Sequence, residues 1–546
     1  MNSVSLSPGS WNQGRLLRWA AVLLIVLFGI GLNVSALVVS LPTGDESGYL
    51  LDGANLVEHG TVLAIGSGPL PSLVNGLLDL PFRGDHLRLG LVSTIRRILT
   101  YGGILLAVWW AARRVGGETA GWIGLVLAAV GRPVSVALDN SADALYMTLS
   151  ALAFALGAAM VLDLIDKKEP PRGWTGRSVA LGVLLGMAAL AHLDGLALGV
   201  LVFACALALA IMGRWPREDR QALLRAGLFG LGGFALPVVG WIVISSLLRG
   251  SWDTQILQRS YLAFEQGHNF LYSGRFEVPP PVTSDQLYGT AVANHYSVLR
   301  AVARNPRAFL ARIPLVLADA VRMFENSYGI VAGLLVLLLA VAGAIYLGTV
   351  VPAFLGFAGL WFVPLLGYLF ASYRPGFFST VYPEVLVLLS AGMAALLGEF
   401  RSLWPRAALR PTLFTSVLLL LLAVGGNIEY GAEQGLAWVR GRGTSPDLQW
   451  VEALSQHIAR GSCIISYDTA DPIYANLVPN GDWMTYFETH SASNLIEFML
   501  AQDCHYVEVD NDLITYAPGY AKLVEATLVL KFSSADGTRK VFSDYP

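Results

Sequence analysis

Long apolar runs that alternate with short polar breaks dominate this chain. A helix needs about 20 apolar residues to cross a bilayer, and in lipid every backbone amide has to be paired within the spanning structure. The pattern therefore predicts a polytopic α-helical membrane protein with eleven spans: residues 16–41, 98–112, 119–137, 143–163, 178–194, 195–212, 225–247, 329–347, 350–371, 379–398 and 412–426.

The scarcity of charge leads to the same conclusion and excludes other classes. Only 14% of the 546 residues are charged and 55% are hydrophobic, whereas a soluble protein carries about 25% charged residues. This rules out a soluble multi-domain enzyme and a disordered chain. A net charge of −3 leaves no basic face for nucleic acid. Three cysteines are too few for a disulfide scaffold or a cysteine-based metal cluster.

The positions of the basic residues predict an orientation. Arg15 and Arg18 precede the first run, which is too long for a signal peptide and is interpreted as a signal anchor. With the N-terminus in the cytoplasm, the inner breaks collect most arginines and lysines. The outer breaks 138–142 and 194–195 carry none, and 372–378 carries only Arg374. Basic residues favour the cytoplasmic side, so the C-terminus is predicted to lie outside.

Three long segments then share the outer face: 42–97, 248–328 and 427–546. The first two are loops of a membrane domain that covers residues 1–426, and the third is a separate small α/β domain. This domain alternates helix and strand patterns, with helices predicted at 448–459 and 492–501 and strands at 463–467 and 506–509.

Two further features of the outer segments leave alternatives open. Cys463 and Cys504 lie at the two predicted strands, and they either pair in an oxidising compartment or remain two buried thiols. The 248–328 segment is expected to form interfacial helices at 255–267 and 306–324. Its arginines are expected to meet anionic headgroups: Arg300, Arg304, Arg307 and Arg312.

Polar side chains gather at the predicted outer membrane boundary. Ionisable groups near the hydrocarbon are costly and therefore usually mark function. Four separate connections deliver them to one level, which indicates an outward-facing cavity with carboxylates and a cation: Asp45, Glu46, Asp139, Asp143, His192, Asp194 and Arg374. For His192 the alternative is a satisfied core histidine, and for Arg374 it is an interfacial side chain that reaches the headgroups.

The first outer segment is the most informative. Residues 47–59 are predicted to be helical, with Ser47 or Asp45 as the cap and Gly60 as the end. One face carries Asp45, Tyr49, Asp52 and His59, and another carries Leu50, Ala54 and Val57. We expect an amphipathic helix in the membrane interface with its acids toward the cavity. The alternative is that Asp45 and Glu46 only favour the positive end of the helix dipole.

Four short motifs resemble the GT-C membrane glycosyltransferases, in particular the ArnT and protein-O-mannosyltransferase group. Asp45-Glu46 followed by Gly60 resembles the opening of that family's first outer loop. The other matches are Ser141–Tyr146, Met187–Gly195, and Tyr373-Arg374 with Tyr382-Pro383. The plan of about eleven spans with an outer C-terminal α/β domain is also similar.

The resemblance implies an inverting glycosyltransferase of the bacterial inner membrane that uses a polyprenyl-phosphate sugar donor. Asp45 would be the general base, and Glu46 or Asp143 would orient the acceptor (a lipid, glycan or protein) or a divalent ion. Other residues implied in donor or acceptor binding are Tyr49, Asp52, His59, His192, Asp194, Arg374 and Tyr382. The family's third motif usually carries a basic residue, whereas here it carries His192 and Asp194. Arg374 is thus the first candidate for the donor phosphate and Arg132 the second.

Three other functions fit parts of the pattern. A transporter would explain the spans, but transporters show related halves and polar groups deep inside several spans. A polymerase or ligase acting on lipid-linked envelope polysaccharide would be another transferase. A non-catalytic scaffold of an envelope-assembly complex would need no carboxylate at position 45.

Overall fold

The computed structural model describes most of the chain between Asp45 and Tyr545. The described residues are 23, 27, 45–59, 69–82, 88–130, 141–167, 173–192, 194–213, 216–249, 255–273, 280–328, 330–371, 380–403, 446–466, 470–475, 477–480, 495–516 and 518–545. The predicted spans 412–426 and nearly all of 16–41 lie outside this set. Leu23 and Leu27 are helical and exposed.

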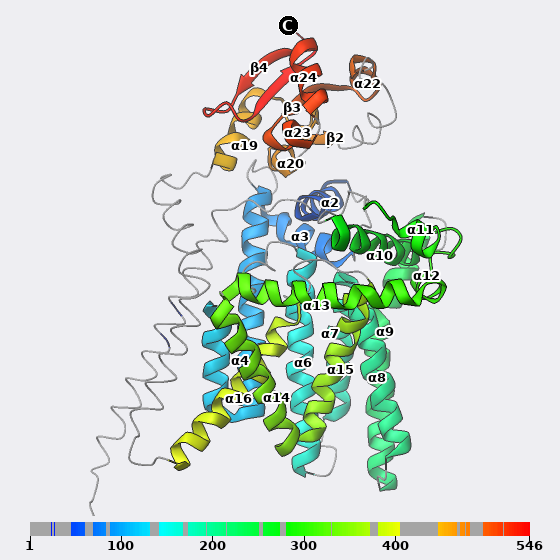
Figure 1. Ribbon diagram of the computed structural model, residues 1–546, viewed down its shortest axis with the longest axis vertical. Helices are drawn as coiled ribbons and strands as arrows, with labels where there is room; N and C mark the ends of the chain where they lie inside the picture. Colours follow the sequence, from blue (N-terminus) through cyan, green and yellow to red (C-terminus); the bar gives the residue numbers. More distant parts are fainter. Residues whose placement is uncertain are drawn as a thin grey trace, which may run out of the picture.

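The helices of the membrane domain agree with the predicted spans. Figure 1 shows them running side by side below the sheet domain. Among the described residues, five helical elements are long and apolar enough to cross a membrane: Leu89–Ala129, Ser141–Ile165, Trp174–Ala191, Gly195–Met212 and Arg217–Leu247. The full bounds of the helical elements are α4 (Arg88–Val130), α6 (Ser141–Lys167), α7 (Trp174–Ala191), α8 (Asp194–Met212), α9 (Arg217–Arg249), α14 (Ile330–Val350), α15 (Pro352–Ala371) and α16 (Tyr382–Leu403).

The element α4 contains two antiparallel helices, as the two predicted spans 98–112 and 119–137 require. Gly117 has φ 80° inside it, a conformation that favours glycine because a Cβ would be strained there. The hydroxyl of Tyr101 donates a hydrogen bond of 2.7 Å to the carbonyl of Ala129. In one unbroken helix, positions 28 residues apart would be separated by about 42 Å. The chain therefore turns back at Gly117.

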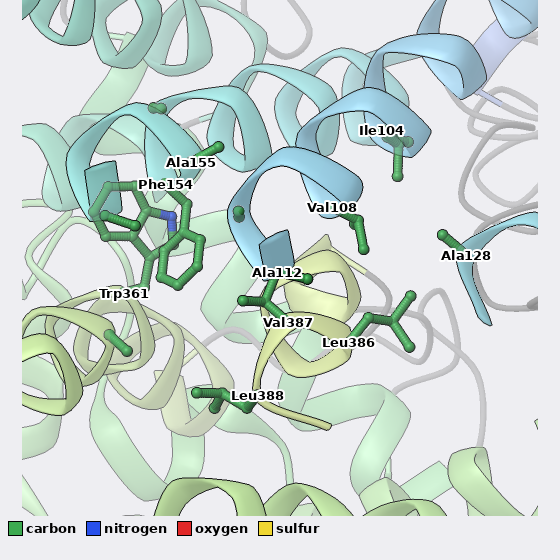
Figure 2. Packing of buried hydrophobic residues seen from close by; sticks show 14 of the residues in the cluster. Ile104, Val108, Ala112, Ala128, Phe154, Ala155, Trp361, Leu386, Val387 and Leu388 are labelled. Atoms are coloured by element: carbon green, nitrogen blue, oxygen red, sulfur yellow. The ribbon is translucent and has the colours of Figure 1, made fainter. Parts of the chain in front are cut away.

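The core of the bundle is built from small and aromatic side chains. Figure 2 shows Phe154 of α6 beside Trp361 of α15, and Val108 and Ala112 of α4 facing Val387 of α16. The ring centroids of Phe154 and Trp361 are 5.3 Å apart. Alanines let the helix backbones approach closely, which is how helices associate in lipid without a hydrophobic driving force between them.

At the end of the bundle away from the sheet domain, charged side chains join three helices. Asp163 of α6 pairs with Arg114 of α4 and, at 2.7 Å, with Arg177 of α7. The guanidinium of Arg113 lies 5.2 Å from the ring centre of Trp109. Arginines and tryptophans are typical of a membrane–water boundary.

A layer of short and tilted helices separates the bundle from the sheet domain. Figure 1 shows α13 running across the bundle, with α2, α3 and α10 to α12 above it. Their bounds are α2 (Asp45–His59), α3 (Leu70–Asp79), η1 (Leu80–Phe82), α10 (Gln255–Ser273), α11 (Ser284–Tyr288), α12 (Val298–Arg304) and α13 (Pro306–Tyr328). The helices predicted at 255–267 and 306–324 are confirmed and extend further.

The C-terminal domain is a five-stranded mixed sheet with short helices. The strand order is β2-β1-β3-β5-β4, in which β2, β1 and β3 are parallel and the β4–β5 hairpin is antiparallel. The bounds are α19 (Pro446–His457), β1 (Cys463–Ile465), α20 (Ala470–Tyr474), β2 (Val478–Asn480), α22 (Leu495–Ala501), β3 (Cys504–Val509), α23 (Asn511–Tyr516), α24 (Pro518–Thr527), β4 (Val529–Ser533) and β5 (Lys540–Ser543). The α/β prediction is confirmed, although β2 and the hairpin were not foreseen.

A disulfide joins Cys463 and Cys504, which decides the alternative that the sequence left open. It connects the first residues of the neighbouring strands β1 and β3, and 41 positions separate the two cysteines in the chain. A cross-link of this kind restricts the unfolded chain.

Replacing both cysteines with serine should lower the free energy of unfolding of the C-terminal domain by about 2–4 kcal/mol. Thermal unfolding of the purified protein in detergent would measure the change. The matched control is Cys205→Ser, because Cys205 of α8 forms no disulfide. Equal unfolding temperatures for the double variant and this control would contradict a stabilising disulfide.

The C-terminal domain and the helix α2 share one hydrophobic core, which corrects the expected environment of α2. Leu50 and Ala54 were expected on a face that lies in the membrane interface. In the structure both are buried in a cluster with Leu454 of α19 and Ile473 of α20. Trp450 belongs to the same cluster. Protein rather than lipid covers this apolar face. Packing against the C-terminal domain removes these side chains from water just as insertion into lipid would.

Candidate functional site

Glu46 is the best-defined acid at the end of the bundle that faces the sheet domain. Its side chain is fully buried and pairs with Nη2 of Arg96 at 2.8 Å, and the Arg96 side chain is only 1% exposed. The backbone N–H of Ser141 donates to the second carboxylate oxygen at 2.6 Å. Glu46 therefore joins the start of α2 to α4 and to the first residue of α6, where a carboxylate also meets the positive end of the helix dipole.

The first turns of α6 bring further predicted site residues into the same region. Asp143 lies in the first turn of α6 and is half-buried. One turn further, Tyr146 is buried, and its ring centre is 5.6 Å from that of His192, which ends α7. Through the contact between Glu46 and Ser141, three connections of the chain therefore converge: the start of α2, the start of α6 and the end of α7.

The polar face of α2 is packed against protein. Tyr49 and Asp52 are 6% and 7% exposed. On the neighbouring helix α3, a Cβ added to Gly76 would lie 2.8 Å from the carbonyl oxygen of Gly53, so only glycines allow this approach. Asn75 of α3 is also buried, and its side-chain atoms have no hydrogen-bond partner. Tyr49 and Asp52 thus lie in a closed layer and not on an open surface.

Several predicted residues lie outside what the structure describes. Asp45 is the first residue of α2, so the helix begins two residues before the predicted start at Ser47, but the side chain of Asp45 is not described. The same holds for the side chains of His59 and Asp194. Three predicted residues lie wholly outside: Arg132, Asp139 and Arg374.

Tyr382 lies at the start of α16 and is 2% exposed within the main core of the bundle. Within that element, Glu384 is fully buried and one of its carboxylate oxygens accepts a hydrogen bond of 3.1 Å from Ser150 of α6. The indole N–H of Trp361 donates to the same Ser150 hydroxyl at 2.9 Å. This polar contact between α6, α15 and α16 was not foreseen from the sequence.

Arg96 is the partner of Glu46 that sequence reasoning missed. It lies at the end of the predicted outer segment 42–97, just before the second span at 98–112, with Arg97 beside it. Two adjacent arginines at an outer membrane boundary depart from the tendency of basic residues to lie inside. That departure was the available signal that an acid holds an arginine at this position, as Glu46 holds Arg96. Both are 1% exposed.

Among the described residues, no group of three or more histidine, cysteine, aspartate or glutamate side chains is arranged to hold a metal ion. Glu46, which the sequence associated with a possible ion, is already neutralised by Arg96. One carboxylate oxygen pairs with Arg96 and the other accepts from the N-terminus of α6. These contacts are those of a group that holds helices together.

The C-terminal domain contains a second buried carboxyl group, Glu508 of β3. The indole of Trp450 donates to one of its oxygens at 2.6 Å, and the hydroxyl of Ser466 donates to the other at 2.7 Å. Burial raises the pKa of Glu508 to about 7, although these two hydrogen bonds act in the opposite direction. The carboxyl group lies beside the core that the domain shares with α2, because its hydrogen-bond partner Trp450 is part of that core.

The pKa of Glu508 predicts a pH dependence of stability. The unfolded chain releases this proton near pH 4.5, whereas the folded domain keeps it up to about pH 7. Stability should therefore fall as the pH rises between these values, by up to about 1.4 kcal/mol per unit. Glu508→Gln should flatten this profile in thermal unfolding, whereas Glu497→Gln, on the exposed face of α22, should leave it unchanged. A profile identical in both variants would contradict the assignment.

The architecture is similar to solved membrane glycosyltransferases. No protein-family model and no curated protein matches the sequence. ArnT from Cupriavidus metallidurans bound to undecaprenyl phosphate superposes with a TM-score of 0.56 and 14% identity over 98% of both chains. AglB, an oligosaccharyltransferase from Archaeoglobus fulgidus in complex with an inhibitory peptide and a dolichol-phosphate, gives 0.53 and 13% over 96% of this chain and 74% of that one.

This chain has the GT-C glycosyltransferase fold. The resemblance proposed from short motifs is thus confirmed at the level of architecture, including a polytopic helical bundle with a small C-terminal sheet domain. At these identities the comparison establishes the fold, and the roles of individual residues stay predictions.

Proposed function

We propose that this protein is an inverting glycosyltransferase that moves a sugar from a polyprenyl-phosphate donor to an extracytoplasmic acceptor. The observation that carries the proposal is the fixed start of α2. Glu46 anchors it to α4 through Arg96 and to α6 through Ser141, on a fold that lipid-linked glycosyltransferases share. A rigid anchor of this kind sets the position of the preceding carboxylate, Asp45.

The proposed chemistry gives each group one task. Asp45 takes the proton from the acceptor hydroxyl as that oxygen attacks the anomeric carbon, and the bond to the donor phosphate breaks on the opposite face. Charge develops on the leaving phosphate, and Arg374 and His192 are the proposed groups that stabilise it. Glu46 holds α2, while Asp143 orients the acceptor or a divalent ion bound through oxygen ligands. Tyr49, Asp52, His59, Asp194 and Tyr382 complete the proposed binding surface.

A divalent ion enters this proposal only as a prediction. One AglB structure was determined with zinc and sulfate, which is a property of that protein. In this chain the acids that remain for an ion are Asp45, Asp139 and Asp143, because Glu46 is paired with Arg96.

The proposed location is the bacterial inner membrane, with the N-terminus in the cytoplasm and the C-terminal domain outside. The distribution of arginines supports this orientation. The disulfide between Cys463 and Cys504 supports it independently, since disulfides persist in oxidising compartments and are rare in the cytosol. Accessibility of a cysteine introduced at exposed Asp536 to a membrane-impermeant reagent would test it.

The function is tested by comparing the envelope of a deletion strain with that of its parent. Mass spectrometry of lipids, glycans and glycoproteins should show one sugar missing from one acceptor in the deletion strain. The purified protein in proteoliposomes should restore that sugar when the polyprenyl-phosphate donor is supplied. Movement of a solute across the proteoliposome membrane without any sugar transfer would identify a transporter and overturn the proposal.

A further inference from the structure

Arg312 is a buried cation that forms no ion pair with any acid among the described residues. Its side chain is 0% exposed, and none of its three guanidinium nitrogens has a hydrogen-bond partner of normal geometry. The sequence predicted that Arg312 would meet headgroups at the surface, as the exposed Arg300 and Arg307 are free to do. A buried arginine in this state is unusual, because buried charges are normally paired.

Two aromatic side chains surround the guanidinium. It lies 4.9 Å from the ring centre of Phe264 of α10, a distance that allows a cation–π interaction. The hydroxyl of Tyr288 of α11 interacts electrostatically with Arg312 but is also buried without a hydrogen-bond partner of normal geometry. The ring of Tyr288 packs edge-on against Phe264 at 4.9 Å. The helices α11 and α13 therefore place unsatisfied O–H and N–H groups together, beside an aromatic ring of α10.

A histidine completes this cluster. The ring centre of His268 lies 6.1 Å from that of Tyr288. One ring nitrogen, Nε2, donates to the carbonyl of Val282 at 2.9 Å, and the other, Nδ1, is buried without a partner. Burial lowers the pKa of His268, and the positive charge of Arg312 lowers it further. An anion at this point would offset that charge and favour the protonated ring, whose Nδ1–H would be a further donor.

The segment that follows the cluster in the chain has the character of a membrane surface. Large apolar side chains are exposed on it: Val292 in the turn before α12 at 70%, Leu299 of α12 at 82% and Leu310 of α13 at 58%. Exposed Arg300 and Arg307 lie beside these residues in the sequence. Exposed apolar residues interleaved with arginines are typical of helices that lie at the boundary between lipid tails and headgroups. The anions available there are lipid phosphates.

We propose that Arg312, Tyr288 and His268 form a binding site for the phosphate group of a membrane lipid. The planar guanidinium binds phosphate oxygens in pairs and keeps its charge when buried. Tyr288 and His268 supply single hydrogen bonds at its side. The lipid is either polyprenyl phosphate or a glycerophospholipid, since both present the same phosphate chemistry at this depth. The site stands independently of sugar transfer.

Lipid binding by the purified, delipidated full-length protein tests the site. Native mass spectrometry would compare polyprenyl phosphate, the uncharged polyprenol and phosphatidylglycerol, with inorganic phosphate as a soluble competitor. Arg312→Gln should weaken binding of the phosphate-bearing lipid at least tenfold, and Tyr288→Phe should weaken it several-fold. Arg307→Gln is the matched control, because it removes the same charge from the exposed face of the same helix and should change binding less than twofold.

The outcomes show which lipid supplies the phosphate group and whether the site binds phosphate at all. Binding of polyprenyl phosphate alone identifies a donor or product lipid, and binding of phosphatidylglycerol alone identifies a structural lipid; both support the site. Equal binding of polyprenol and polyprenyl phosphate, or equal losses in Arg312→Gln and Arg307→Gln, would overturn it. If Arg312→Gln does not fold, Arg312→Lys and Tyr288→Phe decide, because Arg312→Lys keeps a buried positive charge and Tyr288→Phe removes only one hydroxyl group. Unchanged binding in Tyr288→Phe and Arg312→Lys would then also overturn the site.

Discussion

Arg96→Met should destabilise the outer half of the membrane domain by about 3–5 kcal/mol, the usual cost of leaving one partner of a buried ion pair uncompensated. Glu46 would keep its contact with the N–H of Ser141 but would lose its cation while fully buried. The start of α2 and the first turn of α6 would then separate more easily. Thermal or urea unfolding of the purified protein in detergent would measure the loss.

A second variant, which also removes the charge of Glu46, separates the loss of the ion pair from the cost of an unpaired buried charge. The double variant Glu46→Gln with Arg96→Met should recover part of the stability, because it leaves no buried charge. Arg300→Met, on the exposed face of α12, is the matched control and should change stability by less than about 0.5 kcal/mol. Destabilisation by Arg96→Met equal to that of the control would show that the pair does not hold α2.

Asp45→Asn should reduce sugar transfer by about 10²–10⁴-fold while leaving the protein folded, since an amide has nearly the same shape but cannot accept the proton of the acceptor hydroxyl. Initial rates in proteoliposomes with a saturating donor would measure the change in kcat. Donor binding should be preserved, because the base acts on the acceptor.

The matched control for Asp45 is Glu118→Gln, an exposed acid next to the turn at Gly117. It removes one carboxylate at the turn between the two limbs of α4 and should leave the rate unchanged. Transfer retained by Asp45→Asn would remove Asp45 as the base. The same variant with normal stability and no transfer, together with an active control, would support the assignment.

Much of the fold could be predicted because hydropathy is a local property. Nine of the predicted spans coincide with described helices, including the two limbs of α4, because each apolar run has to be shielded from water whatever its neighbours are. The α/β character of the C-terminal domain was also readable from short alternating patterns. Its β4–β5 hairpin was not, because β4 is largely exposed and carries a weak apolar alternation.

The candidate site, too, could be predicted only in part from the sequence. The sequence predicted that acids collect at one membrane boundary, because charges are rare in this chain and their positions are therefore informative. It did not show that Glu46 pairs with Arg96, 50 positions away, and caps a helix 95 positions away. Nor did it show that Leu50 and Ala54 are covered by the C-terminal domain, since an apolar face has the same pattern against lipid and against protein.

The sequence by itself determined that this chain spans a membrane, where its helices run and at which end its acids collect, because these properties depend on the spacing of residues along each helix. Only the tertiary structure decided which charges neutralise one another. Glu46 pairs with an arginine and a helix N-terminus, whereas Arg312 is buried without an acid among the described residues. In the sequence both residues are charges near apolar runs, and their difference depends on which distant side chains the fold brings within a few ångströms.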